Sequence, residues 1–383
     1  MVFKANLGFR NVSMAMTVLC GECKIERAPS HEICVQWALK VGFYKLSVPK
    51  KREDGQWIWI VDHAVKAGAD KCLIVLGIKL DQIKGRRDLT LSLDDVAPLG
   101  VISMRVSNGK TVNEEFEKLA AKTGIPKALV IDHGSDLRSG AKKFCRKHSG
   151  LLLFYDIVHK IALVIASRIK NNSRWQAFTV AAARTKKELQ LTGFHRLAPP
   201  NQRSKARWLN VDVLTDWAVK CLDGADRCLY TLPAQLQWLH DYRGEITLWK
   251  QYTEVARATR DLVRKHGYGK SAGEMLEGCL IKMDTSNRLV EDFACELIDF
   301  VNQESAQIKT SIRMIGTTEI IESAIGWFKS LLGDTHWSQT GLGRLRLALA
   351  GRLGGIDMPT VEQSLYTVKT SDVDCWLATA NAA

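Results

Sequence analysis

The chain has 383 residues, of which 46% are hydrophobic and 25% charged; these are the proportions of an ordinary globular protein, at a length sufficient for two or three domains. The 54 Lys and Arg residues outnumber the 41 Asp and Glu residues, and the resulting net charge of +13 is typical of proteins that bind a polyanion. The ten cysteines are too sparse for a disulfide scaffold, and the most apolar window, residues 151–166, contains Asp156, His159 and Lys160, which excludes a membrane span.

The positive charge is concentrated in short clusters, which favour nucleic acid as the partner over a merely basic surface. We therefore predict contacts with double-stranded DNA. Since residues 1–12 lack the apolar run of a secretory signal, we expect a cytoplasmic protein, associated with the nucleoid if its host is a prokaryote. The predicted DNA contacts are Lys50, Lys51, Arg52, Arg86, Arg87, Lys142, Lys143, Arg203, Lys205 and Arg207.

Residues 1–52 are predicted to be helical. A helix capped by Ser30 carries an apolar stripe (Ile33, Cys34, Trp37, Ala38, Val41) and is expected to end at Gly42, and a shorter helix over residues 11–19 precedes it. Two short helices ahead of a basic segment suit a helix-turn-helix DNA-binding module, although helical hairpins without that function are equally common.

Residues 53–160 change to a strand pattern. Three apolar strands are predicted at 57–61, 71–78 and 101–106, then a helix at 113–122 that ends at Gly124. A strand at 128–131, a helix at 137–147 and a strand at 151–155 follow. The predicted order is three antiparallel strands, then strands that alternate with helices. This is the order of an RNase H-like mixed sheet, so the predicted fold class is α/β.

Residues 161–311 show only helical periodicity, which predicts an all-α insertion domain. A strong helix signal returns at 317–332, and residues 312–383 are expected to complete the RNase H-like domain. The tail after Gly354 is expected to be loosely attached at the periphery.

Asp62 and Asp132 are predicted to follow two neighbouring strands, which would bring their carboxylates to one edge of the sheet. Taken singly, an aspartate at a strand end is more often a turn or cap residue. A pair at adjacent strand ends suits two-metal phosphoryl transfer, in which hard oxygen ligands hold two Mg²⁺ or Mn²⁺ ions about 3.5–4 Å apart.

The segment Val130-Ile131-Asp132-His133-Gly134-Ser135 resembles the D-N-G-S turn of retroviral-type integrases and many transposases. Asp136 is the rival second ligand. Asp156 and His159 resemble the C/D-x-x-H element of Mutator-like transposases and are assigned as accessory residues; a helix cap with a surface histidine is the alternative.

The segment from Thr317 to Ser323 resembles the T-T-N-x-x-E-S stretch that carries the last glutamate in Mutator-type transposases. This resemblance selects Glu322 as the third ligand. Glu319 replaces the asparagine of that stretch, lies on the same helix face and is the second candidate. The 190 residues between Asp132 and Glu322 (322 − 132) are the separation expected when a helical domain is inserted ahead of the last carboxylate.

The order and spacing of these motifs resemble those of insertion-sequence-type DDE transposases. The resemblance implies an oligomeric enzyme that cleaves DNA at transposon ends and joins them to a target, with Asp62, Asp132 and Glu322 as catalytic metal ligands. A structure-specific nuclease of the same fold and a transposase-derived, non-catalytic DNA-binding protein remain as alternatives.

Cys20, Cys23, His31 and Cys34 have ligand types and spacings compatible with a small zinc site. We do not expect zinc there, because Cys34 falls on the apolar stripe of its helix.

Overall fold

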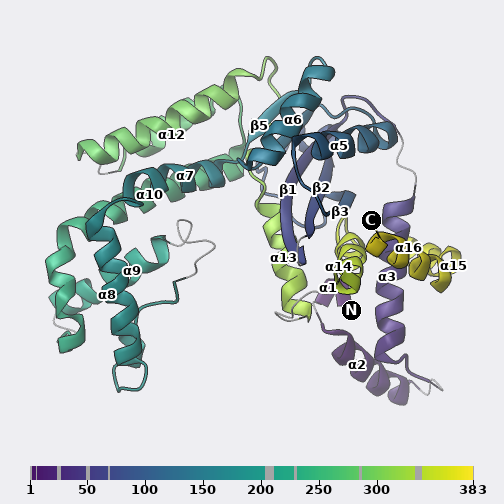
Figure 1. The fold of residues 1–383 in the computed structure, drawn as a ribbon, viewed down its shortest axis with the longest axis horizontal. Coiled ribbons are helices and arrows are strands. Elements are labelled where there is room, and N and C mark those ends of the chain that lie inside the picture. Colours follow the sequence, from purple (N-terminus) through teal and green to yellow (C-terminus); the bar gives the residue numbers. More distant parts are fainter. Residues whose placement is uncertain are drawn as a thin grey trace. The chain divides into compact units, whose positions relative to one another are not determined.

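The computed structural model describes residues 2–5, 7–23, 27–48, 52–67, 70–202, 211–227, 231–283, 287–332 and 339–382. They form two compact units, one made of Met1–Asp156 with Gly316–Ala383 and the other of Ile157–Ile315 (Figure 1). The finer division predicted from the sequence, with a separate module at residues 1–52, stays a prediction.

The first unit is built on a mixed five-stranded sheet, and the predicted α/β fold class is confirmed. Its strand order is β3-β2-β1-β4-β5, in which β1, β2 and β3 pair antiparallel and β4 and β5 join β1 in parallel. The strands are β1 (Trp57–Ala67), β2 (Asp70–Lys79), β3 (Ala97–Met104), β4 (Ala128–Ile131) and β5 (Leu152–Tyr155).

Both faces of this sheet are covered, because successive side chains of a strand point to opposite faces. Trp59 and Val61 of β1 pack with Phe116 and Phe144 of α5 (Gly109–Thr123) and α6 (Ser135–Lys147). The alternate residues Ile58 and Ile60 are equally buried on the other face. Figure 1 shows α5 and α6 over the sheet and α13 (Glu319–Leu332) beside β1, which it contacts.

The predicted helix at Ser30 exists, but it does not end at Gly42. Helix α3 (His31–Ser47) begins with the Ser30 hydroxyl accepting a hydrogen bond from the Ile33 amide and continues for another turn beyond the glycine. A Cβ at Gly42 would stand 1.8 Å from the carbonyl oxygen of Leu347 in α14 (Gln339–Arg352). This glycine therefore serves the close approach of two helices rather than the end of one.

Of two further sequence expectations for this unit, one is right in part and one is wrong. In the predicted stripe of α3, Cys34, Ala38 and Val41 are buried, whereas Ile33 and Trp37 are each 43% exposed, because the buried face extends toward Leu39 and not toward these two residues. The C-terminal tail is not loose, since Val373 is fully buried in a cluster with Leu39. The remaining helices of the unit are α1 (Val2–Ala5), α2 (Phe9–Glu22), α4 (Leu80–Ile83), α15 (Met358–Thr367) and α16 (Thr370–Ala382).

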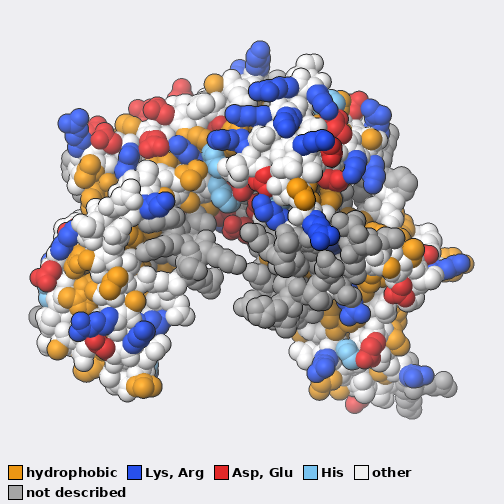
Figure 2. All heavy atoms as spheres, viewed as in Figure 1, with side chains coloured by type: hydrophobic (Ala, Val, Ile, Leu, Met, Phe, Trp, Pro, Cys, Tyr) orange, Lys and Arg blue, Asp and Glu red, His pale blue; other side chains and the backbone are white. Residues whose placement is uncertain are grey.

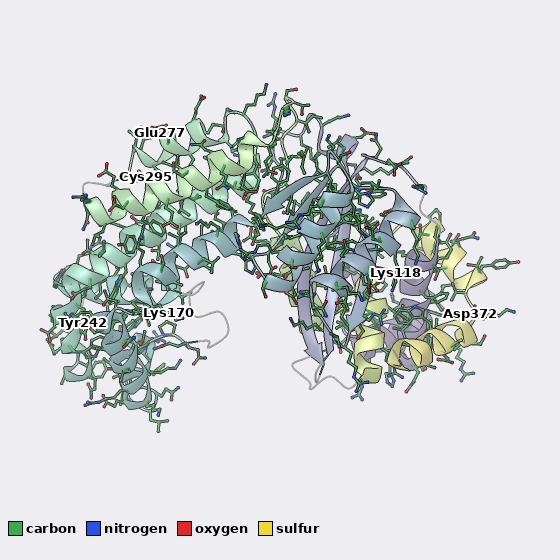
Figure 3. The ribbon with its side chains drawn as sticks, turned by 45° about the horizontal axis from the view of Figure 1, so that its top comes forward. Lys118, Lys170, Tyr242, Glu277, Cys295 and Asp372 are labelled. Atoms are coloured by element: carbon green, nitrogen blue, oxygen red, sulfur yellow. The ribbon has the colours of Figure 1, made fainter. Side chains whose placement is uncertain are left out.

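Among its described residues, the regular elements of the second unit are all helices, apart from one isolated bridge between Tyr268 and Met314. Its core contains an aromatic group in which Phe178 contacts Trp249 and Tyr242, and the last of these is labelled in Figure 3. The helices are α7 (Ile157–Ile169), α8 (Ser173–Leu189), α9 (Val211–Asp226), α10 (Arg243–His266), α11 (Ala272–Leu280) and α12 (Arg288–Ala306), with short 3₁₀ segments at His195–Leu197 and Ala234–Tyr242. Across the described part of the chain, no helix combines the length and apolarity needed to cross a membrane.

Candidate active site

The strand register places Asp62 and Asp132 side by side. The parallel pairing of β1 with β4 runs from Ile58 opposite Ala128 to Val61 opposite Ile131, and the two aspartates are the next residues on their strands. Neighbouring strands lie about 4.8 Å apart, so the two backbones are adjacent at this edge. The Asp62 residue is only 7% exposed, whereas Asp132 is half-buried.

The position of Asp62 within its strand differs from the prediction. Strand β1 does not end there but continues to Ala67, paired with β2. What ends beside Asp62 is β4, at Ile131. Asp62 thus gains a rigid position in mid-strand and still borders an open edge, because its parallel neighbour has stopped.

The turn after β4 explains the glycine at position 134. The Asp132 Oδ1 atom accepts a hydrogen bond from the Gly134 amide, at 2.9 Å. A Cβ at Gly134 would lie 3.0 Å from that oxygen and 3.3 Å from Oδ1 of Asp136. Its φ of −56° is accessible to any residue, so this glycine is not needed for an unusual backbone angle. A side chain here would instead crowd the two carboxylates, which would have to move slightly.

Asp136, the rival second ligand, is engaged elsewhere. Its Oδ2 atom accepts hydrogen bonds from Lys71 Nζ (2.9 Å) and Ser107 Oγ (2.6 Å) and lies 3.6 Å from His63 Nδ1. Burial alone would raise the pKa of this carboxyl, but the bonds from Ser107 and Lys71 outweigh it and hold the pKa well below its usual range. The carboxylate of Asp136 therefore fixes α6 to the sheet.

His63, Lys71 and Ser107 are site residues that the sequence analysis missed. The His63 ring also hydrogen-bonds to Ser107, at 3.2 Å. Burial, together with the charge of Lys71, lowers the pKa of His63, although the charges of Asp136 and Asp132 act to raise it. The alternation of side chains along β1 could have predicted His63, because a strand that directs residue 62 to one face directs residue 63 to the other face, which α6 covers.

Asp156 connects the end of β5 to the start of α13. Its amide donates to the Ile131 carbonyl at 2.8 Å, which continues the alignment of β5 with β4. Its Oδ1 atom accepts a hydrogen bond from the Thr318 amide at 3.1 Å, across 162 residues of sequence. Only 1% of Asp156 is exposed. A buried carboxylate at the edge of the sheet thus binds the segment that leads into α13, the helix of the two candidate glutamates. His159, the other accessory residue, lies on α7, in the second unit.

The two candidate glutamates differ in burial. Helix α13 buries Ile321 and Ala324, and it contacts β1. Glu322 is exposed, and Glu319 is half-buried with its Oε2 atom shielded from solvent. The predicted helix therefore lies next to the strand of Asp62, with one glutamate open to solvent and one turned inward.

The fit of this region to a divalent cation is partial. Carboxylate oxygens are the donors that Mg²⁺ and Mn²⁺ prefer, and the fold brings their strands and helix together. Within the described ranges, however, no three His, Cys, Asp or Glu side chains are grouped closely enough to hold a metal ion. That statement covers the cysteine cluster too, in which Cys20 and Cys34 are buried and Cys23 is exposed.

The predicted DNA-contacting residues have different environments. Lys50, Lys51, Arg203, Lys205 and Arg207 lie outside the described residues. Arg52 lies 3.9 Å from Asp54, Arg86 pairs with Asp95, and Arg87 is exposed. Lys142 and Lys143 are exposed on α6.

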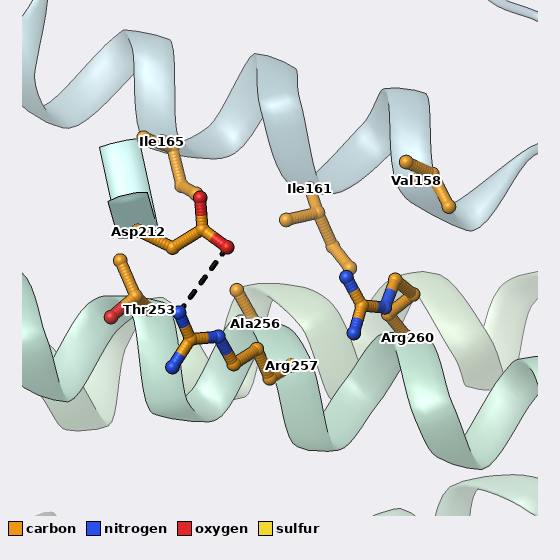
Figure 4. A pocket seen from close by; sticks show the side chains of 8 residues that line it. All are labelled: Val158, Ile161, Ile165, Asp212, Thr253, Ala256, Arg257 and Arg260. Carbon is orange, nitrogen blue, oxygen red and sulfur yellow. Dashed lines mark hydrogen bonds and ion pairs between the residues drawn. The ribbon is translucent and has the colours of Figure 1, made fainter. Parts of the chain in front are cut away.

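A small cavity in the second unit, of about 50 Å³, carries no candidate site (Figure 4). Its walls are three apolar side chains of α7, Asp212 of α9, and Thr253, Ala256 and two arginines of α10. Arg257 pairs with Asp212 and Asp216, and Arg260 pairs with Asp261. The cations are thus neutralised, and the volume admits only water-sized molecules.

Similarity to known proteins is found among solved structures. No protein-family model and no curated protein match the sequence. Among solved structures, the chain is similar to one in the Drosophila P element transposase strand transfer complex, with 14% sequence identity and a TM-score of 0.37, over 92% of this chain and 98% of that one. At this level of similarity, the comparison assigns no residue of this chain a role.

Proposed function

We propose that this protein is a DDE-type DNA transposase, which cleaves DNA strands at the ends of a mobile element and joins them to a target. The observation that carries the proposal is the register that sets Asp62 beside Asp132, at the point where β4 ends. The tether from Asp156 to Thr318 adds to it, because it brings the start of the glutamate helix to the same edge.

In this proposal Asp62, Asp132 and Glu322 hold two Mg²⁺ or Mn²⁺ ions, and Glu319 lies outside the metal shell. Such ions, when bound, supply charge stabilisation for the phosphodiester oxygens and lower the pKa of an attacking hydroxyl. The rigid β1 backbone orients Asp62, and Asp156 positions α13 without touching DNA. Lys71 and Ser107 keep Asp136 in place, which leaves Asp132 as the carboxylate of the turn that faces the reaction.

The test uses the DNA that flanks the coding sequence, cloned in a plasmid and incubated with the full chain and Mg²⁺ or Mn²⁺. We expect nicks or breaks at defined positions, and joining of the released 3′ ends to a second plasmid. Asp62→Asn and Asp132→Asn should each reduce cleavage by several orders of magnitude, because a neutral amide cannot hold the metal charge, while DNA binding persists.

Asp136→Asn serves as the matched control, since it neutralises a carboxylate of the same turn. It should lower thermal stability and leave most of the cleavage. Loss of cleavage in Asp136→Asn but not in Asp132→Asn would show that the second ligand is misassigned. Cleavage without any joining of ends would replace the transposase with a nuclease.

A further inference from the structure

The exposed face of α6 is positively charged along its whole length. Arg138, Lys142, Lys143, Arg146 and Lys147 are all exposed, and the one acidic residue of the helix, Asp136, is half-buried against Lys71. Figure 2 shows these blue side chains gathered over α6. Helix α10, by contrast, carries charges of both signs, and its Arg260 pairs with Asp261.

The cations of this face are not balanced by neighbouring acids. Lys147 pairs with Glu117 at 3.1 Å, but no carboxylate among the described residues lies within ion-pair distance of the other four. Like charges four residues apart, such as Arg138 and Lys142, destabilise a helix by a few tenths of a kcal/mol per pair. The helix dipole accounts for basic residues in the last turn, but it disfavours Arg138 in the first.

The spacing of the basic face suits a regular polyanion. Arg138, Lys142 and Arg146 follow one another at four-residue intervals, so they share a helix face over about 12 Å. One strand of duplex DNA carries a phosphate about every 3.4 Å along its axis, which corresponds to roughly three or four phosphates over that length. Arg138 lies six residues after Asp132, so the row starts near the candidate active site.

We propose that the exposed face of α6 docks the phosphate backbone of duplex DNA next to the catalytic edge. The inference rests on the proposed function and deepens it by assigning the surface that holds the substrate. Its mode of recognition is independent of base sequence, since flexible cations directed at phosphates read charge and not base edges.

The experiment replaces Arg138, Lys142, Lys143 and Arg146 together by Gln, a good helix former, in the full chain. Binding to a 30-base-pair duplex is followed by fluorescence anisotropy in EDTA, from low to physiological salt. Because each phosphate contact contributes about 0.9 to the slope of log K against log salt, the slope should become shallower by about 3 to 4. Affinity at about 100 mM salt should fall at least tenfold. The single variant Arg138→Gln should make the slope shallower by about one, and it tests the proposal if the fourfold variant folds poorly.

The matched control replaces Lys265, Lys270, Lys282 and Lys309, four exposed lysines of the second unit, by Gln. Both variants have a net charge of 13 − 4 = +9. The control should shift the slope by less than one. Equal shifts in the two variants, or a wild-type slope in the α6 variant, would overturn the proposal, and so would a greater loss for duplex RNA than for duplex DNA. Because binding is measured without a divalent cation, its outcome is independent of whether the protein cleaves DNA.

Discussion

Asp132 and Asp136 are only four positions apart in the sequence, yet their carboxylates have different hydrogen-bond partners. The Asp136 carboxylate accepts hydrogen bonds from the side chains of Lys71 and Ser107, whereas the Asp132 carboxylate accepts one from the backbone amide of Gly134. A carboxylate already bonded to an ammonium and a hydroxyl would lose both to take up a metal, at a cost of about 1.5–3 kcal/mol for each charged hydrogen bond. At the residue scale, this distinction makes Asp132 the better candidate ligand.

The two glutamates of α13 provide a prediction at the same scale. Residues three apart on a helix point about 60° apart around its axis, so only one of them can complete a metal site well. Glu322→Gln should reduce Mg²⁺-dependent cleavage by orders of magnitude, and Glu319→Gln should retain most of it.

The measurement is single-turnover cleavage of the flanking DNA, with the Mg²⁺ stabilisation of each variant followed by thermal melting as an independent readout. The reverse pattern, with Glu319→Gln inactive and Glu322→Gln active, would transfer the ligand role to the inward residue.

At the scale of elements, the first unit is held together by contacts between its two ends. Lys45 of α3 is buried, and its ammonium donates to the carbonyls of Gly351, Leu353 and Gly355, at 3.0, 2.6 and 2.6 Å. These carbonyls lie at or just beyond the C-terminus of α14, where a helix leaves backbone acceptors without intrahelical partners. The buried ammonium of Lys45 in α3 thus caps the C-terminus of α14, some 300 residues away in the sequence.

The close approach at Gly42 leads to a stability prediction. Gly42→Ala would put a methyl carbon 1.8 Å from the backbone of Leu347, so α14 must move, and unfolding free energy should fall by about 3 kcal/mol. Gly21→Ala is the control, because this helical glycine has no atom within 4 Å of its added Cβ, and alanine should stabilise α2 by roughly 0.5–1 kcal/mol. Urea unfolding followed by circular dichroism compares the two. A Gly42→Ala protein as stable as the wild type would mean that the two helices are not in this contact.

At the scale of the whole molecule, the first unit is assembled from two separate segments of sequence, with the second unit between them. The points at which the chain leaves and re-enters the first unit are close, because the Asp156 carboxylate bonds to the amide of Thr318. On the α5 and α6 face of the sheet, the buried cluster is drawn from residues up to Phe144, with neighbours up to Tyr155, and includes no described residue of the second unit.

This closeness predicts that the first unit folds by itself. Replacing residues 157–315 by a flexible linker of about six Gly and Ser residues, with a mean span of roughly 13 Å, should join the two segments without strain. We expect a cooperative thermal transition and well-dispersed amide resonances. A product with strand-like circular dichroism but no cooperative melting would show that the second unit is needed for folding.

Much of the sheet was predictable from local sequence. Strand β4 at 128–131 follows from a short apolar run, and the end of α5 follows from Gly124, whose φ of +88° in the structure is one that glycine adopts readily. The adjacency of Asp62 and Asp132 follows in part from the predicted strand order, which makes β1 and β4 neighbours, whereas the register of Val61 opposite Ile131 is set by the structure. These features depend on interactions over a few residues or on the small number of ways in which strands can be ordered.

Only the tertiary structure decided the rest. The role of Gly42 as a point of close helix approach depends on Leu347, and the hydrogen bonding of Asp136 depends on Lys71, a residue 65 positions away. Asp156 could be read as a helix cap from its neighbours, yet it bonds to Thr318. In each case the contacting residue is distant in the sequence and near in space. The periodicity of apolar residues predicts which face of a helix or strand a side chain occupies, but not which distant group it contacts there.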